Sequence, residues 1–96
     1  MPPTDRPNSR LRLTFFGRVQ GVGFRATARD IARGFDVTGW VRNEPDGSVS
    51  MEIQGQPSEI AACLDRLRAR MKHHITRDSE LPLTPRTGEA EFTIER

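Results

Sequence analysis

The 96-residue sequence has a single cysteine, no tyrosine and no long apolar run, and each absence excludes something. One cysteine, Cys63, cannot form an internal disulfide, and it favours a reducing compartment. Cys63 also occupies an apolar position of a helical pattern, so we expect a small buried side chain rather than a nucleophile. No apolar segment is long enough to span a bilayer, and the N-terminus lacks the apolar segment of a signal peptide. We therefore expect a cytoplasmic protein without a membrane partner.

The hydrophobic content is low, at 34%, with a mean hydropathy of −0.63. Part of this comes from the start of the chain, where Met1 is followed by polar residues and three prolines up to Arg10. Such a composition predicts a disordered tail over 1–9. The remaining residues, 10–96, suffice for one domain with a modest core, which we expect to be a monomer.

Lysine is also scarce, because Lys72 is the only one, and the excess positive charge comes from arginine. The formal net charge is +2 and the sequence pI is about 9.5. Arginine pairs with phosphate through a planar fork, so its excess fits phosphate ligands or nucleic acid. For most single arginines, however, we favour a solvated position on a helix face together with a compositional bias.

Alternation of apolar and polar residues predicts strands over 11–16, 37–43, 49–54 and 91–95. Between the second and third of these, Pro45 and Gly47 fit a turn that closes a hairpin. A weaker alternation over 75–83 is interrupted by Arg77 and Ser79, and we interpret it as a strand near an edge, ended by Pro82 and Pro85.

Two segments follow a helical period instead. The first begins at Phe24 and ends at Gly34 or Asp36, where a left-handed cap is expected. The second opens at 56–58, with Pro57 at its edge and Ser58 as its cap. Its apolar stripe comprises Ile60, Cys63, Leu64, Leu67 and Met71.

The resulting order of elements is β-α-β-β-α-β. It predicts an α+β, ferredoxin-like sandwich, in which two helices cover one face of an antiparallel sheet. One pairing that this plan allows places the final strand, 91–95, beside the first.

The most informative segment is Val19-Gln20-Gly21-Val22-Gly23-Phe24-Arg25. Two glycines leave the backbone nearly free of side chains where a helix begins, and an arginine follows. Amide N–H groups at a helix start, beside a guanidinium, form a site for a dianionic phosphate.

Together with Gly17-Arg18, this segment resembles the first signature of acylphosphatases. Gly39-Trp40-Val41-Arg42-Asn43, followed by Asp46-Gly47-Ser48-Val49, resembles the second. The resemblance is strong from Leu13 to Gly55. It implies a ferredoxin-like fold and hydrolysis of the carboxyl–phosphate bond of acyl phosphates without a metal or organic cofactor.

The resemblance also implies the roles of individual residues. Arg25 would bind the phosphoryl group, and Asn43 would hold the attacking water. Inorganic phosphate would be both product and inhibitor. The phosphate oxygens would be cradled by the backbone of Gln20, Gly21, Val22, Gly23, Phe24 and Arg25.

Two positions depart from the family pattern. Asp36 stands where a glycine is usual after the first helix, so that helix end is shortened or Asp36 is strained. The segment 71–83 lacks the common Gly-Pro turn, which leaves the register of the fourth strand open.

Two other functions remain open at this point. The same order of elements builds RNA-recognition sheets, for which Phe16 and Trp40 are the aromatic residues available for stacking. A non-catalytic sensor of acyl or carbamoyl phosphate would need only the phosphate site. We expect hydrolysis, with no nucleic-acid partner.

Overall fold

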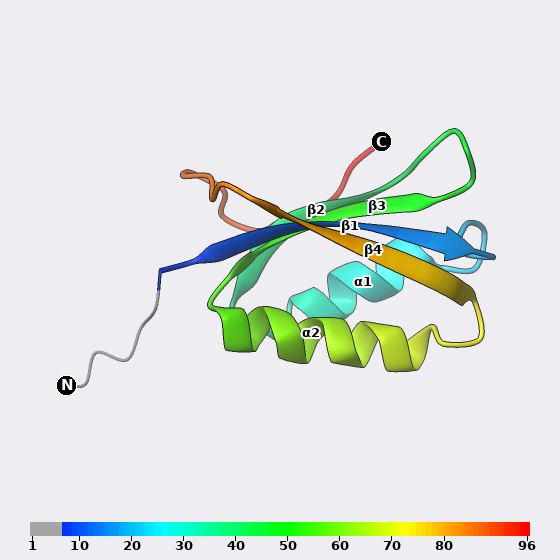
Figure 1. The fold of residues 1–96 in the computed structure, drawn as a ribbon, viewed down its shortest axis with the longest axis horizontal. Helices are drawn as coiled ribbons and strands as arrows, with labels where there is room; N and C mark the ends of the chain where they lie inside the picture. Colours follow the sequence, from blue (N-terminus) through cyan, green and yellow to red (C-terminus); the bar gives the residue numbers. More distant parts are fainter. Residues whose placement is uncertain (1–6) are drawn as a thin grey trace.

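Two helices cover one face of a five-stranded sheet in the computed structural model, which describes residues 7–96 (Figure 1). The strands lie in the order β4-β1-β3-β2-β5. This arrangement confirms the ferredoxin-like α+β fold predicted from the sequence. In chain order the elements are β1 (Ser9–Gly17), α1 (Phe24–Ala32), β2 (Val37–Asn43), β3 (Val49–Gly55), α2 (Pro57–Arg70), β4 (Ile75–Leu83) and β5 (Phe92–Ile94).

The core lies between the sheet and the helices, and the predicted periodicities build it. Leu13 and Phe15 of β1 and Ile53 of β3 are fully buried, because alternate residues of each strand face the helices. The predicted stripe of α2 is buried as well. Burial, with a smaller contribution from the charge of Glu59, raises the pKa of the Cys63 thiol to about 11. Cys63 is therefore the small buried side chain that the sequence predicted.

The last strand corrects the predicted topology. β5 pairs with β2, not with β1, and it does so in parallel, with Val41 opposite Ile94. The reason is that β3 and β4 pair with the two edges of β1, so β2 offers the edge that β5 joins. The sheet is therefore mixed, with antiparallel pairing everywhere except between β2 and β5.

β4 has the predicted bounds and the predicted place at the edge of the sheet, but Pro82 does not end it. It runs through Pro82, which lies opposite Leu11 of β1, and ends at Leu83. Proline does not end this strand because β4 is at the edge of the sheet, where a missing N–H on the outer side breaks no pairing.

The end of α1 and the start of α2 both differ from the predicted caps. Gly34 has no positive φ, and no non-glycine residue among 7–96 has one, so neither Gly34 nor Asp36 forms a left-handed cap. Without a positive φ, Asp36 is not strained, and its N–H donates to the Glu59 carboxylate at 2.8 Å. At the start of α2 the cap is Gln56 rather than Ser58, because a residue before proline is held in an extended conformation.

The chain enters the sheet within the predicted tail. β1 begins at Ser9, which pairs with Gly55, whereas residues 1–6 lie outside the described part of the chain. Arg10 follows directly and is only 2% exposed. A solvated arginine, the interpretation favoured for single arginines, is therefore wrong at this position.

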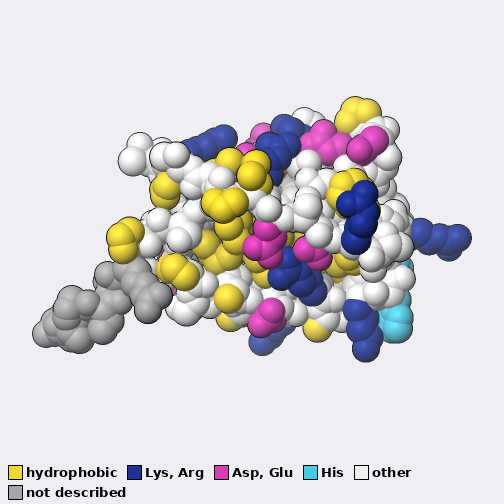
Figure 2. All heavy atoms as spheres, viewed as in Figure 1, with side chains coloured by type: hydrophobic (Ala, Val, Ile, Leu, Met, Phe, Trp, Pro, Cys, Tyr) yellow, Lys and Arg dark blue, Asp and Glu magenta, His cyan; other side chains and the backbone are white. Residues whose placement is uncertain are grey.

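On the face shown in Figure 2, acidic and basic side chains are interspersed. Among the described residues, the large hydrophobic side chains that are exposed are Val22, at 37%, and Leu81, at 57%. Within residues 7–96, neither helix has the length and apolar character needed to cross a membrane.

Candidate active site

The loop between β1 and α1 owes its shape to two glycines. Gly21 and Gly23 have φ angles of 77° and 78°, a left-handed conformation that other residues rarely adopt. Gly23 is also the N-cap of α1 and brings no side-chain cap. The first hydrogen bond of the helix runs from the N–H of Thr27 to the carbonyl of Gly23, at 2.9 Å. The N–H groups of residues 24–26 therefore precede the helical ladder and can serve an anion.

Buried side chains hold this loop against the sheet. Val19 and Phe24 are each 1% exposed. The ring of Phe24 packs on that of Phe15 in β1, with centroids 5.0 Å apart. The start of α1 is thus fixed relative to the end of β1, which gives the loop a defined position.

A cavity of about 330 Å³ lies beside the loop. The loop, the start of α1, the end of β2 and the end of β5 all contribute to its wall. Its lining residues are Val19, Gly21, Gly23, Phe24, Arg25, Ala26, Asn43, Ile94 and Arg96.

Arg25 and Asn43 reach this cavity from different elements. Arg25 is the second residue of α1 and half-buried, and its side chain makes no ion pair or hydrogen bond within residues 7–96. Asn43 is the last residue of β2, where it pairs with Val49 of β3. The cavity therefore combines an unneutralised guanidinium with a carboxamide and the amides at a helix start.

The predicted hairpin places Asn43. The N–H of Gly47 donates to the carbonyl of Glu44 at 3.1 Å, and Gly47 has a φ of 92°, as expected for the turn. Asp46 accepts hydrogen bonds from both the N–H and the hydroxyl of Ser48. The turn is thus fixed directly after the strand that ends in Asn43.

The cavity brings together Gly21, Gly23, Phe24, Arg25 and Asn43 of the predicted site. Two other predicted residues do not line it. Val22 is 37% exposed, and the Gln20 side chain donates to the β2–β3 turn. The phosphate contacts predicted for their backbone amides stay predictions.

Sequence reasoning missed the contribution of Ile94 in β5 and of Arg96, two residues after it. The alternation in 91–95 predicted a strand there, but it carried no information about the partner strand. The parity shared by Phe92, Ile94 and Arg96 was the available signal that these side chains lie on one face.

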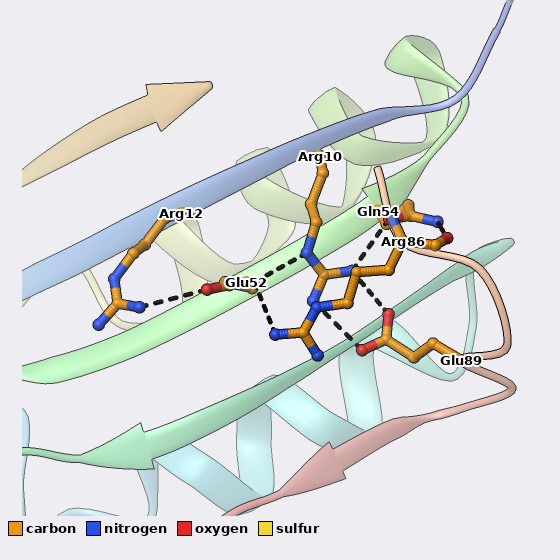
Figure 3. Close-up of polar contacts among 6 residues, drawn as sticks. All are labelled: Arg10, Arg12, Glu52, Gln54, Arg86 and Glu89. Atoms are coloured by element: carbon orange, nitrogen blue, oxygen red, sulfur yellow. Dashed lines mark hydrogen bonds and ion pairs between the residues drawn. The ribbon is translucent and has the colours of Figure 1, made fainter. Parts of the chain in front are cut away.

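A cluster of polar side chains on the other face of the sheet holds the segment that leads to β5 (Figure 3). We call it the Arg10 cluster. Its members are Arg10, Arg12, Glu52, Gln54, Arg86 and Glu89.

Arg10 is the centre of this cluster. Its Nε donates to Glu52 at 2.8 Å, and its two terminal nitrogens donate to the Glu89 carboxylate at 2.9 and 3.2 Å. Gln54 makes two hydrogen bonds with the backbone of Arg86, each 2.8 Å long. The segment between β4 and β5 is therefore fixed to β1 and β3, and this fixes where β5 reaches the cavity.

Glu89 is ionised within the cluster. Burial opposes its ionisation, but hydrogen bonds from Arg10 and Thr38 and the charge of Arg10 outweigh that effect and lower the pKa of the carboxyl. Within residues 7–96, no group of three or more His, Cys, Asp or Glu side chains is placed to hold a metal ion.

Comparison with known proteins gives the same family as the sequence signatures. The acylphosphatase family model matches residues 11–94, so this chain belongs to the acylphosphatase family. An acylphosphatase of Geobacillus kaustophilus is 40% identical over 86 residues, which cover 88% of this chain and 92% of that protein. An acylphosphatase of Rhizobium etli is 57% identical over 61 residues, but the match spans only 64% of this chain and 65% of that protein.

A solved structure supports the fold. The crystal structure of acylphosphatase from Bacillus subtilis superposes with a TM-score of 0.81 at 26% sequence identity. The match covers 92% of this chain and 99% of that one.

Proposed function

We propose that this protein hydrolyses acyl phosphates to a carboxylate and inorganic phosphate. The observation that carries the proposal is the cavity in which Arg25, Asn43 and the amides at the start of α1 meet. Membership of the acylphosphatase family supports the same reaction. The substrate is then a small molecule, and inorganic phosphate acts as product and as competitive inhibitor.

Arg25 and the loop bind the phosphoryl group in this proposal. A guanidinium can donate two parallel hydrogen bonds to two phosphoryl oxygens. The amides of 20–25 donate to the oxygens that remain. Catalysis of phosphoryl transfer consists mostly of positioning and of stabilising charge, which these groups supply without a metal.

Asn43 orients the attacking water. Its carboxamide oxygen accepts a hydrogen bond from water, but it does not usefully take up a proton at neutral pH. The water oxygen bonds to phosphorus while the bond from phosphorus to the acyl oxygen breaks. The electron pair leaves with the carboxylate, and the water proton passes to the phosphate or to solvent. Because a carboxylate leaves readily, the site needs no strong general acid.

Phosphate release from benzoyl phosphate tests the proposal directly. The wild-type protein should release phosphate well above the spontaneous rate in the presence of a chelator, and added inorganic phosphate should inhibit competitively. Release at the spontaneous rate, with phosphate still bound, would reject the enzyme and favour a sensor of acyl phosphates.

The structure does not favour an RNA-binding sheet. Trp40 is on the face without helices but is 8% exposed, with the guanidinium groups of Arg12 and Arg42 over its ring at 5.4 and 4.7 Å. The ring of Phe16 is covered by Arg77 at 3.8 Å. Neither ring is free to stack on a base.

We also propose that the protein acts as a monomer in the cytoplasm, with residues 9–96 as one folding unit. The buried Cys63 and the sparse exposed hydrophobic side chains support this proposal. Size-exclusion chromatography with light scattering should give the mass of one chain.

A further inference from the structure

The end of β5 brings a second guanidinium to the cavity. Side chains alternate between the two faces of a strand. Thr93 and Glu95 line a separate hollow, together with Trp40 on the face without helices. Ile94 and Arg96 line the cavity that contains Arg25. The alternation of β5 thus continues past Ile94 and places Arg96 on the same side of the sheet as Arg25.

The register of β5 places Arg96 beside Asn43. Val41 lies opposite Ile94 in the parallel pair, and the N–H of Glu95 donates to the carbonyl of Val41 at 2.8 Å. The paired residues end there, but the same register continued by two residues leads to Asn43 and Arg96, and both line the cavity. Neighbouring strands lie about 5 Å apart, so the backbone of Arg96 starts next to the residue proposed to orient water.

The charges around the cavity are unbalanced. None of its nine lining residues has an acidic side chain. Neither Arg25 nor Arg96 makes a side-chain hydrogen bond or ion pair within residues 7–96, whereas Arg10 and Arg68 are each paired with carboxylates. Two unneutralised guanidinium groups at one cavity repel each other, and an anion between them relieves that repulsion.

We propose that Arg96 is a second phosphate-binding residue, which acts with Arg25 on the same dianionic group. The inference rests on the proposed function, because it assigns Arg96 to the phosphoryl oxygens of the acyl phosphate and of the product. Two cations bind a dianion better than a monoanion, so the site prefers the fully ionised form of phosphate.

Binding of inorganic phosphate, measured by calorimetry, tests this role without relying on turnover. Arg96→Gln should weaken binding about tenfold, the effect of one charge-assisted contact at a partly exposed site. Arg96→Lys should retain most of the affinity, because it keeps the charge. Arg33→Gln is the matched control: it removes the same charge from an exposed residue at the end of α1, outside the cavity, and should leave the affinity unchanged.

The pH dependence separates direct contact from a structural effect. Wild-type affinity should rise as phosphate loses its second proton, and this rise should be smaller in Arg96→Gln. Equal affinities of the wild type and Arg96→Gln, or an equal loss in Arg33→Gln, would overturn the inference while leaving benzoyl phosphate hydrolysis intact. Conversely, tight phosphate binding that depends on Arg96, without any hydrolysis, would reject only the proposed function.

Discussion

The side-chain amide of Gln20 donates a 2.7 Å hydrogen bond to the carbonyl of Glu44, and so joins the β1–α1 loop to the β2–β3 turn. The same amide donates to the carbonyl of Ser48 at 2.9 Å. Asn43 immediately precedes this turn. The Gln20 side chain, which does not line the cavity, therefore links the loop directly to the turn that follows Asn43.

Replacing Gln20 with leucine should lower kcat about tenfold and leave the affinity for inorganic phosphate nearly unchanged. The turn loses both donors, at a cost of roughly 1–3 kcal/mol, and Asn43 loses its fixed position relative to the loop. Steady-state kinetics and phosphate titration measure the two effects. Gln56→Leu is the control, because the Gln56 amide contacts exposed Asn8 instead. A variant that melts earlier but keeps the wild-type kcat would reduce Gln20 to a structural role.

Substitution of Arg25 should remove most activity. Arg25→Ala should lower kcat/KM by about 10³-fold or more, as expected for an arginine that stabilises a transferring phosphoryl group. Arg25→Lys should recover little, because an ammonium cannot make the two parallel hydrogen bonds of the guanidinium fork. The assay is phosphate release from benzoyl phosphate. Near-normal hydrolysis by the lysine variant would show that the fork is not used.

Asn43→Ala should act on kcat rather than on KM. The expected loss is about 10²-fold, as for removal of one positioned hydrogen-bonding group from an active site. Binding of inorganic phosphate should persist, because Arg25 and the loop amides are untouched. If KM rose while kcat stayed constant, Asn43 would be a substrate-binding residue instead.

The Arg10 cluster makes stability depend on pH through Glu89. Its pKa is lowered in the folded state, so its ionised form stabilises the fold at neutral pH, and this contribution is lost as the pH falls through the folded value. Glu89→Gln should therefore be less stable than the wild type at pH 7, by about 1–3 kcal/mol. The difference should shrink below about pH 4.

Urea unfolding of both proteins at pH 7 and at pH 3 provides the measurement. Glu91→Gln, an exposed glutamate that makes no side-chain contact with the cluster, is the control. If the free energies of unfolding of the wild type and Glu89→Gln differed by the same amount at both pH values, the ionisation of Glu89 would not be the cause of the difference.

Sequence patterns predicted those features that depend on residues close together in the chain. The glycine loop before Phe24, the hairpin after Asn43 and the stripe of α2 all depend on residues a few positions apart, and the structure has each of them. The cavity follows from the first two, because the loop and the hairpin meet at one end of the sheet.

Long-range pairing was not predictable in the same way. Arg10 reads as the end of a polar tail, and its partners Glu52 and Glu89 are 42 and 79 residues away. The choice of β2 as partner for β5 depends on which sheet edge β4 has taken, which no periodicity encodes. Arg96 was missed for that reason. The end of α1 was also missed, because the helix ends at Arg33 in a right-handed conformation and the N–H of Gly34 donates to the carbonyl of Ile31, without a left-handed cap.

A crystal structure of the protein with orthovanadate tests the central claim most directly, since vanadate resembles a transferring phosphoryl group. We predict the anion in the cavity, within hydrogen-bonding distance of the guanidinium of Arg25 and of the amides at the start of α1, with Asn43 facing its apical oxygen. A structure with vanadate bound elsewhere, this cavity filled by solvent and Arg25 turned outward would contradict the account.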